Sequence, residues 1–210
     1  MTETTDWASA AEQQVLDQAL RLIPLKGWTR AMALEAGRGA GLSPGETDLL
    51  IPHGPADLAA LLSRRHDAAA LAALPDPAAL KIRDKIRRAV EARLDAACAD
   101  EASVRRWTGF LALPPNMALG ARLLWESADV LWRWAGDDAT DENHYSKRAI
   151  LSAILATGLA IRLTSGKAAA MKHVDARIEN VMAFEKWKAG VKPADVLKDV
   201  ATALGKIRYR

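Results

Sequence analysis

The stretch of sequence that decides the fold is AGLSPGETDLL, residues 40–50. Gly41 permits a tight turn, because glycine tolerates positive φ angles at no steric cost. Ser43 is a good N-cap, Pro44 suits the first helical position, and Glu46 completes a capping box. The stretch therefore predicts a turn followed by a short helix, which is the central part of a helix-turn-helix.

The region around this stretch, residues 15–62, resembles the DNA-binding domain of TetR-type repressors. An amphipathic helix over residues 15–23 precedes a short helix, the turn and the next short helix. The matching positions are Ala19, Gly27, Ala40, Gly41, Leu42, Ser43, Gly45, Leu58 and Leu61. The resemblance implies a helix-turn-helix region over residues 1–62.

The helix that would read DNA lacks the charge for that task. A recognition helix needs donors for phosphates and base edges. Residues 44–50 contain Glu46 and Asp48 and no Lys or Arg, and an aliphatic pair, Ile51 and Pro52, stands where the repressors place an aromatic residue before a histidine. We therefore expect the helix-turn-helix to be kept as a fold element only.

The composition is typical of an all-α protein. Half of the 210 residues are hydrophobic, and only 5% are aromatic. Proline, glycine and capping residues divide the chain into about ten helices, so we expect a TetR-like bundle with an amphipathic C-terminal helix. The expected ranges are 15–23, 29–36, 44–50, 55–74, 77–99, 102–111, 114–135, 141–163, 167–188 and 193–207. Residues 63–190 would form the central helical region, and residues 191–210 the C-terminal helix.

Charge and cysteine content limit the function classes. The net charge of +3 is spread along the chain. A single cysteine, Cys98, excludes a disulfide framework and a four-cysteine zinc site, and it fits a reducing compartment. The acidic N-terminus resembles neither a secretory signal nor a transit peptide. The most apolar run, residues 149–161, is shorter than the ~20 residues that span a bilayer and predicts a buried helix.

Catalytic motifs are absent from the sequence. It contains no Glu-x-x-His pair for a di-iron centre, no His-Glu-x-x-His, no P-loop and no Gly-x-Ser-x-Gly. The glycines at 37, 39 and 41 follow a helix rather than a strand, so they predict a turn and not a nucleotide loop. We therefore expect a protein that is not an enzyme and needs no cofactor or metal, with an unrecognised enzyme as a weaker alternative.

The centre of the chain carries a second resemblance. Residues 104–155 contain LPPN at 113–116 and TDENHYSKRA at 140–149. The chain resembles the ubiquinone-biosynthesis accessory family with a TetR-like fold, the ninth numbered member of the coenzyme Q pathway. The carrying residues are Leu113, Pro114, Asn116, Trp132, Ala135, Gly136, Asp137, Thr140, Asp141, Asn143, Tyr145 and Arg148.

This resemblance implies a function and a set of site residues. Members of the family bind isoprenoid or phospholipid in an apolar cavity and associate with the di-iron hydroxylase that acts on demethoxyubiquinone. It implies that residues 63–190 form the lipid-binding and partner-binding region and that Arg148 meets a lipid headgroup. It also implies a hydroxylase-binding patch made of Leu131, Asp141, Asn143 and Tyr145. His144 lies within that patch, where eukaryotic members carry tryptophan.

The residues themselves leave alternatives open at the lipid site. Arg148 opens a long apolar helix, where a guanidinium can hold a phosphate bidentately while lipid tails enter apolar space. Alternatively, Lys147 and Arg148 form a solvated basic face, or they pair with Asp137 and Asp141.

Two tryptophans are further candidates for lipid contact. Trp125 and Trp132 lie on one face of the predicted helix over 114–135. They predict either core packing or an aromatic wall for a polyisoprenoid tail, and both readings need the same apolar face.

The C-terminal helix is basic and amphipathic. Its apolar stripe consists of Val196, Leu197, Val200, Leu204 and Ile207, with Lys192, Lys198, Lys206, Arg208 and Arg210 around and beyond it. Such helices lie in membrane interfaces, so the stripe predicts reversible membrane association. The alternative is packing on the body or on a dimer mate.

These observations lead to one hypothesis and one alternative. We expect an accessory protein that collects a quinone precursor and presents it to the hydroxylase, peripherally associated with the inner face of the cytoplasmic membrane and homodimeric. The alternative is a TetR-type transcriptional regulator that senses a lipid.

Overall fold

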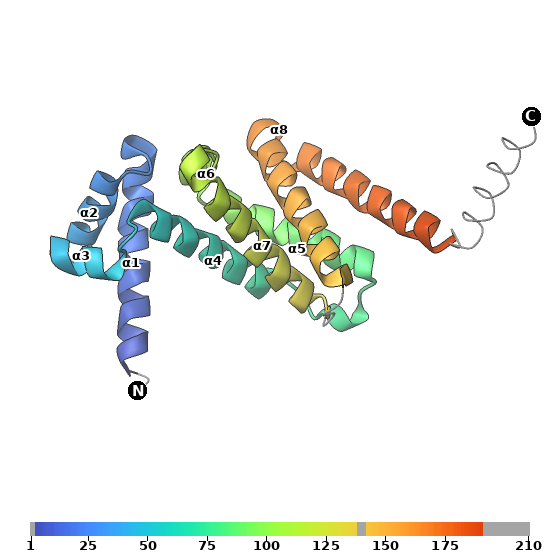
Figure 1. Ribbon diagram of the computed structural model, residues 1–210, viewed down its shortest axis with the longest axis horizontal. Coiled ribbons are helices and arrows are strands. Elements are labelled where there is room, and N and C mark those ends of the chain that lie inside the picture. Colours follow the sequence, from blue (N-terminus) through green and yellow to red (C-terminus); the bar gives the residue numbers. More distant parts are fainter. Residues whose placement is uncertain (1–2, 138–141, 191–210) are drawn as a thin grey trace, which may run out of the picture.

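The computed structural model describes residues 3–137 and 142–190. This part of the chain is all-helical and contains no strand, in agreement with the expected class. It holds eight α-helices and two short 3₁₀ turns, which follow one another along the chain (Figure 1). Their bounds are α1 Glu3–Lys26, α2 Arg30–Gly39, α3 Pro44–Leu50, α4 Pro55–Ala73, η1 Pro77–Ala79, α5 Ile82–Cys98, α6 Glu101–Leu111, η2 Pro114–Asn116, α7 Met117–Trp134 and α8 Glu142–Gly190.

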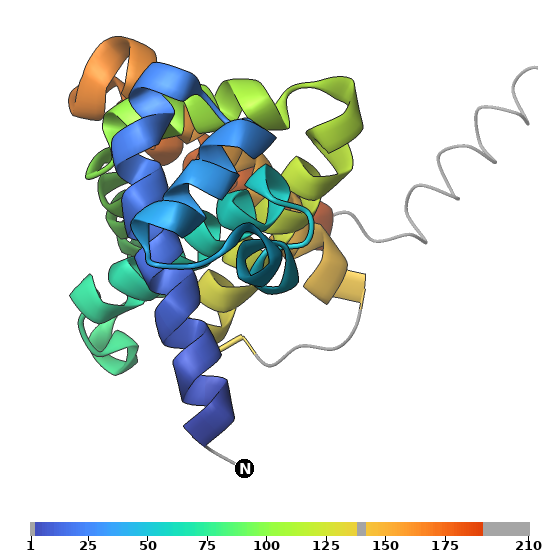
Figure 2. The same ribbon diagram turned by 90° about the vertical axis from the view of Figure 1, so that its left-hand side faces the viewer.

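The first three helices lie at one end of the molecule (Figure 1), with α2 and α3 beside the long α1 (Figure 2). The predicted capping box is confirmed, because the Ser43 amide donates to Glu46 at 2.8 Å and the Glu46 amide donates to Ser43 Oγ at 3.3 Å. A side chain at Gly37 would lie 2.1 Å from Thr47 Oγ1, so α2 and α3 pack closely only because this position is glycine. Gly41 has φ 84° in the turn between them.

Two helices begin later than the sequence predicts. Asp76 accepts a hydrogen bond from the Ala78 amide at 2.9 Å and so caps η1 rather than a long helix. Leu80 then has extended backbone, with φ −101° and ψ 144°, and α5 begins only at Ile82. Proline 114 likewise starts the 3₁₀ turn η2, and α7 follows it. The predicted starts at 77 and 114 were therefore wrong, because each proline begins a 3₁₀ turn.

Helix α8 bends sharply at Gly166, where the sequence predicts a boundary between two helices. Gly166 has φ 83° and ψ −179°, a region open essentially to glycine alone. The bend divides α8 into a first arm, residues 142–165, and a second arm, residues 167–190, which diverge at an angle in Figure 1. The expected count of ten helices is not confirmed, and the helix expected over 193–207 lies outside the described residues.

One stretch within α8, His144–Ala183, could cross a membrane if its length and apolar composition alone are considered. The bend at Gly166 interrupts it, and Leu151, Leu155 and Leu159 are buried in the core. The helix over 149–161 is thus buried on one face only, so the expectation of a buried helix is met in part. Only 33% of its most apolar window is buried, so other apolar side chains of α8 line the hollows described below.

A buried polar cluster joins α4, α5 and the start of α6. Arg93 Nε donates to Asp67 at 2.5 Å, and both side chains are more than nine-tenths buried. His66 is 2% exposed and its Nε2 lies 3.0 Å from Asp100 Oδ2. Its Nδ1 is buried and has no hydrogen-bond partner among the described residues. Burial, together with the neighbouring positive charge of Arg93, lowers the pKa of His66 to about 4.

This histidine makes stability depend on pH. Unfolded His66 takes up a proton near pH 6.5, whereas folded His66 does so only near pH 4. The free energy of unfolding should therefore fall as the pH drops from 6.5 to 4, by up to about 3 kcal/mol. Urea titrations at several pH values measure this fall. The His66→Gln variant should lose the part between pH 6.5 and 5, and an unchanged slope in that variant would contradict the assignment.

Candidate functional site

An apolar cavity lies between the start of α5, the end of α7 and both arms of α8. Its volume is about 340 Å³, and we call it the α5–α8 cavity. Its walls include Ile86, Trp132, Lys147, Ile154, Ile178 and Val181. Binding cavities for small molecules are typically of ~300–1,000 Å³, mostly apolar, with a few polar groups. The α5–α8 cavity has this size and this kind of lining.

Trp132 and Lys147 meet at the wall of this cavity. Trp132 Nε1 donates to the backbone oxygen of Lys147 at 3.1 Å, and Lys147 Nζ lies 5.4 Å from the centre of the indole ring. The indole is thus fixed in orientation, with its polar edge satisfied and its ring against the cavity. Two of the four residues predicted to bind lipid therefore lie together at one hollow.

Arg148 is buried beneath this wall, with 1% of its surface exposed. Its Nε donates to Asp129 at 2.6 Å, and one Nη donates to Asp137 at 3.1 Å and to the His144 carbonyl at 3.3 Å. The pairing with Asp137 is one of the alternatives that the sequence left open. The guanidinium donates to both carboxylates, so in this structure it is not available to a ligand. Asp141 lies outside the described residues.

Asp137 links the two cations. Burial would raise the pKa of the Asp137 carboxyl, but hydrogen bonds and charge from Lys147 and Arg148 outweigh burial and lower this pKa. Lys147 Nζ lies 2.6 Å from Asp137, and Asp129 also accepts a bond from Arg133 at 2.7 Å. Sequence reasoning did not identify Asp129, because its role arises from the packing of α7 against α8.

The predicted hydroxylase-binding residues do not form one exposed surface. Leu131 is fully buried in the core, so a surface role for this side chain is wrong. It lies on the face of α7 that packs inward, and apolar spacing alone would have placed it there. Asp141 and the side chain of Asn143 lie outside what the structure describes.

The other two predicted hydroxylase-binding residues, His144 and Tyr145, lie near Trp125, a neighbour that the sequence did not predict. Tyr145 is 65% exposed and packs edge-on against His144, with ring centres 5.2 Å apart. Its other neighbour is Trp125, at 6.1 Å. Trp125 is thus placed with the predicted partner patch and not in the α5–α8 cavity. We call Trp125, His144 and Tyr145 the aromatic patch.

A second apolar hollow of about 600 Å³ lies between α6, α7 and the first arm of α8. Its walls include Trp107, Leu124 and Leu159, and small residues such as Gly120 and Ala156 leave the space open. This hollow was not predicted from the sequence. The signal was the presence of glycine and alanine on facing sides of two otherwise bulky helices.

The expected absence of a metal site and the membrane role of the C-terminal stripe both remain predictions. Within residues that the structure describes, no group of three or more His, Cys, Asp or Glu side chains could hold a metal ion. The stripe of Val196, Leu197, Val200, Leu204 and Ile207 lies outside the described part of the chain.

The fold and the cavity define an all-helical protein built around an apolar hollow with a cation at its edge. A sequence model of the COQ9 family matches residues 117–185, which form α7 and most of α8. The chain is 31% identical over 165 residues to the human ubiquinone biosynthesis protein COQ9, mitochondrial, covering 74% of this chain and 52% of that protein.

Other relatives agree. The bovine protein of the same name has the same identity and coverage, and the Xenopus laevis protein COQ9-B is 28% identical over 169 residues, covering 72% of this chain and 55% of that protein. The chain belongs to the COQ9 family. It spans about half the length of the curated relatives it matches.

The buried charge cluster makes Arg148 a test of how the site is held. The Arg148→Met variant should be less stable by about 3 kcal/mol, because Asp129 and Asp137 would stay partly buried without their cation. The melting temperature should fall by roughly 6–12 °C. Arg133→Met removes the 71%-exposed partner of Asp129 and serves as the control, with a change below about 1 kcal/mol. Equal effects of the two variants would contradict this account.

Proposed function

We propose that this chain is a lipid-binding accessory protein of ubiquinone biosynthesis. It takes an isoprenoid quinone precursor into the α5–α8 cavity and presents it to the demethoxyubiquinone hydroxylase. The observation that carries the proposal is the apolar cavity, whose walls on α7 and α8 come from the region that matches the COQ9 family, while α5 supplies the rest. The names of the relatives supply the pathway.

The cavity suits a molecule with an apolar tail and a polar head. Ile86, Ile154 and Ile178 offer only hydrocarbon to a tail, and burying each CH₂ group contributes about 0.8 kcal/mol. Lys147 and Arg83 are the cations at the wall, and the side chain of Lys147, which packs on Trp132, is 36% exposed. We assign the contact with the polar head to Lys147. Arg148 holds the turn after α7 in place beneath it.

The chemistry would belong to the partner. The sequence has no Glu-x-x-His pair, so this chain does not supply the usual di-iron ligands. The aromatic patch is the candidate contact for the hydroxylase, because exposed Tyr and Trp side chains often anchor protein interfaces. It lies on α7 and α8 close to the cavity, and Lys147 follows Tyr145 by two residues.

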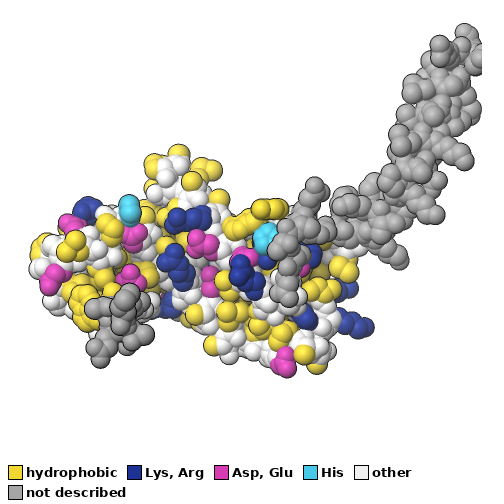
Figure 3. Space-filling model, turned by 60° about the horizontal axis from the view of Figure 1, so that its bottom comes forward, with side chains coloured by type: hydrophobic (Ala, Val, Ile, Leu, Met, Phe, Trp, Pro, Cys, Tyr) yellow, Lys and Arg dark blue, Asp and Glu magenta, His cyan; other side chains and the backbone are white. Residues whose placement is uncertain are grey.

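We further propose that the helices have a TetR-like arrangement without DNA binding. Helix α3 carries Glu46, whose pKa is lowered by hydrogen bonds from Ser43, so the carboxylate is ionised at neutral pH. Asp48 pairs with Arg30 at 2.7 Å, which occupies a cation of α2. On the face shown in Figure 3, acidic and basic side chains are mixed over these helices at the left. A homodimer at the inner face of the cytoplasmic membrane completes the proposal.

The lipid proposal is tested by filling the cavity. Val181→Trp places a large ring in its wall and should weaken retention of a farnesylated phenol roughly tenfold or more, measured by native mass spectrometry from detergent. Ala176→Trp, on the exposed side of the same arm, is the matched control and should retain the probe. Lys147→Gln should weaken retention of a farnesyl phosphate more than that of farnesol. Equal retention by Val181→Trp and the wild type would refute the cavity as the site.

The alternative, a lipid-sensing transcriptional regulator, is tested by gel shift. With Glu46 and Asp48 facing phosphate, we expect no specific complex in the range of about 10⁻⁸–10⁻¹¹ M that is typical of specific DNA binders at physiological salt. Genomic fragments selected over several rounds serve as the probes. Enrichment of one sequence with affinity in that range would establish the regulator and overturn the accessory role.

A further inference from the structure

The second hollow, between α6, α7 and the first arm of α8, is separate from the α5–α8 cavity, and we call it the α6–α8 hollow. The two share no lining residue. Its volume of about 600 Å³ lies within the ~300–1,000 Å³ of small-molecule sites. Trp107, Leu159 and Leu163 line it and are each less than one-tenth exposed, so the hollow reaches inward to the core. A hollow of this depth suits a flexible chain better than a second helix, which would rest on its rim.

Small side chains keep the α6–α8 hollow open. Gly120 and Ala121 line it from α7, and Ala156 and Ala160 line it from α8. A Cβ added at Gly120 would lie 3.4 Å from the Leu111 Cβ, which is ordinary van der Waals contact, so the packing of α6 on α7 does not itself require a glycine here. Protein interiors leave few spaces larger than a water molecule. The small residues therefore leave apolar space that the described side chains do not fill.

One end of the α6–α8 hollow is polar and carries a cation. Arg105 lines it from α6, where Nε and one Nη donate to Glu101 Oε1 at 3.0 and 2.7 Å. The same Nη donates to the Leu163 carbonyl, and the other Nη forms no hydrogen bond within the described part of the chain. Thr108, one turn after Arg105, and Thr164, next to Leu163, also line the hollow. The hollow thus combines an apolar length with a guanidinium at one end.

The ion pair of Arg105 leaves the guanidinium open to exchange. Arg105 and Glu101 are both 51% exposed, and exposed pairs of this kind hold their partners weakly. A ligand carboxylate can bond a guanidinium through both of its oxygens. A carboxylate that is held in place by an apolar chain in the hollow therefore competes well with Glu101.

We propose that the α6–α8 hollow binds a long-chain fatty acid, with the hydrocarbon chain against Trp107 and Leu159 and the carboxylate on Arg105. The chain gains free energy in proportion to the apolar surface that leaves water. The carboxylate is ionised at neutral pH and complements the charge of the guanidinium. A phospholipid offers the same hydrocarbon but no free carboxylate, so Arg105 favours the free acid. This inference does not depend on the proposed function, because the hollow and the α5–α8 cavity are separate.

Equilibrium dialysis with radiolabelled dodecanoate tests the binding, below its micelle-forming concentration and without detergent. The Val181→Trp variant is the parent protein, because its α5–α8 cavity is filled. It should bind dodecanoate at a saturable site, and dodecanol should compete roughly tenfold less well than unlabelled dodecanoate, because it lacks the charge that Arg105 meets. No saturable binding would overturn the proposal. Dodecylphosphocholine carries a phospholipid head, and stronger competition by it than by dodecanoate would assign the hollow to phospholipid and also overturn the proposal.

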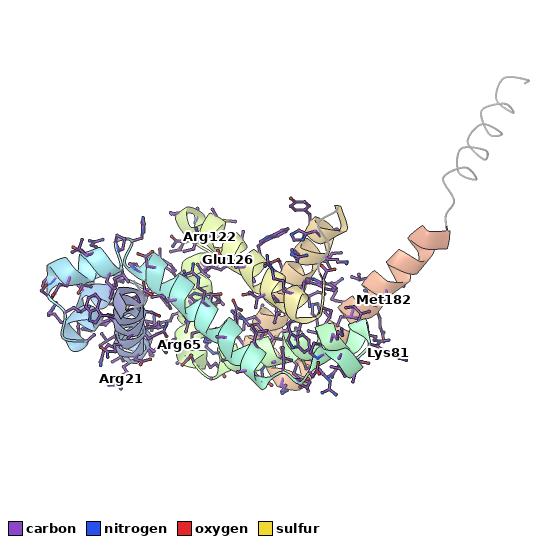
Figure 4. The ribbon with its side chains drawn as sticks, turned by 90° about the horizontal axis from the view of Figure 1, so that it is seen from below. Arg21, Arg65, Lys81, Arg122, Glu126 and Met182 are labelled. Atoms are coloured by element: carbon purple, nitrogen blue, oxygen red, sulfur yellow. The ribbon has the colours of Figure 1, made fainter. Side chains whose placement is uncertain are left out.

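A pair of arginine variants tests the carboxylate contact. Arg105→Gln should weaken dodecanoate binding roughly tenfold and leave dodecanol binding unchanged. Arg122→Gln is the matched control, because Arg122 pairs with Glu126 at 3.5 Å across one helical turn, as Arg105 does with Glu101, and does not line the hollow. Figure 4 shows Arg122 and Glu126 next to each other on α7. Equal dodecanoate binding by the two variants would overturn the proposal.

A pair of alanine variants tests the hollow itself. Ala156→Phe places a ring in the hollow and should weaken the binding of both dodecanoate and dodecanol roughly tenfold or more. Ala153→Phe, on the exposed side of the same arm and outside the hollow, should bind like the parent protein. The melting temperature of each variant checks that it is folded. Dodecanoate binding that is unchanged in Ala156→Phe, together with a changed sedimentation coefficient, would assign the hollow to a contact between copies of this chain and overturn the proposal.

The two hollows are tested apart by exchanging probes. Ala156→Phe in the wild-type background should retain the farnesylated phenol, since this variant leaves the α5–α8 cavity unfilled. If the wild type retains no farnesylated phenol but dodecanoate binding responds to Ala156→Phe and Arg105→Gln, the proposed function fails and the fatty-acid site stands. If dodecanoate binding responds to neither substitution, the fatty-acid site fails whatever the α5–α8 cavity retains.

Discussion

The burial of the Arg148 guanidinium between Asp129 and Asp137 is the constraint on which the candidate site depends. A buried cation needs its counter-charges nearby, because the low-dielectric interior does not stabilise an isolated charge. Asp129 lies within α7 and Asp137 follows its end, so the pair fixes the first arm of α8 against both. Lys85 donates to the Ala135 carbonyl at 2.8 Å and ties α5 to the same turn. These contacts fix the position of the cavity wall that carries Lys147 and Trp132.

The opposite wall is held differently. The second arm of α8 is joined to α5 by ion pairs near the surface, Arg83 with Glu179 at 2.6 Å and Arg87 with Asp175 at 2.8 Å. Exposed pairs of this kind contribute only about 0–1 kcal/mol each and weaken in salt. Some apolar contact supplements them, since Val174 and Ile178 are buried. The cavity therefore lies between one wall fixed by buried charge and one held by apolar packing with exposed ion pairs around it.

The sequence predicted the elements better than their contacts. Local chemistry set the helix bounds, so the capping box at Ser43 and the division of α8 at Gly166 could be read from single segments. The orientation of Arg148 could not, because its partner Asp129 is 19 residues away and is chosen by how α7 packs on α8. The same packing placed Trp125 beside Tyr145. These outcomes depend on tertiary packing, which residue spacing along one helix does not encode.

The survival of a helix-turn-helix in a chain with no basic recognition helix has a folding explanation. Gly37 is required because Thr47 packs where its Cβ would lie, and the Ser43–Glu46 capping box starts α3 in the right direction. Both constraints come from placing α2 against α3, and neither involves DNA. The charge of α3 is a separate property, set by exposed side chains that folding leaves free to change. A motif of glycines and caps therefore reports an arrangement of helices and does not by itself report a function.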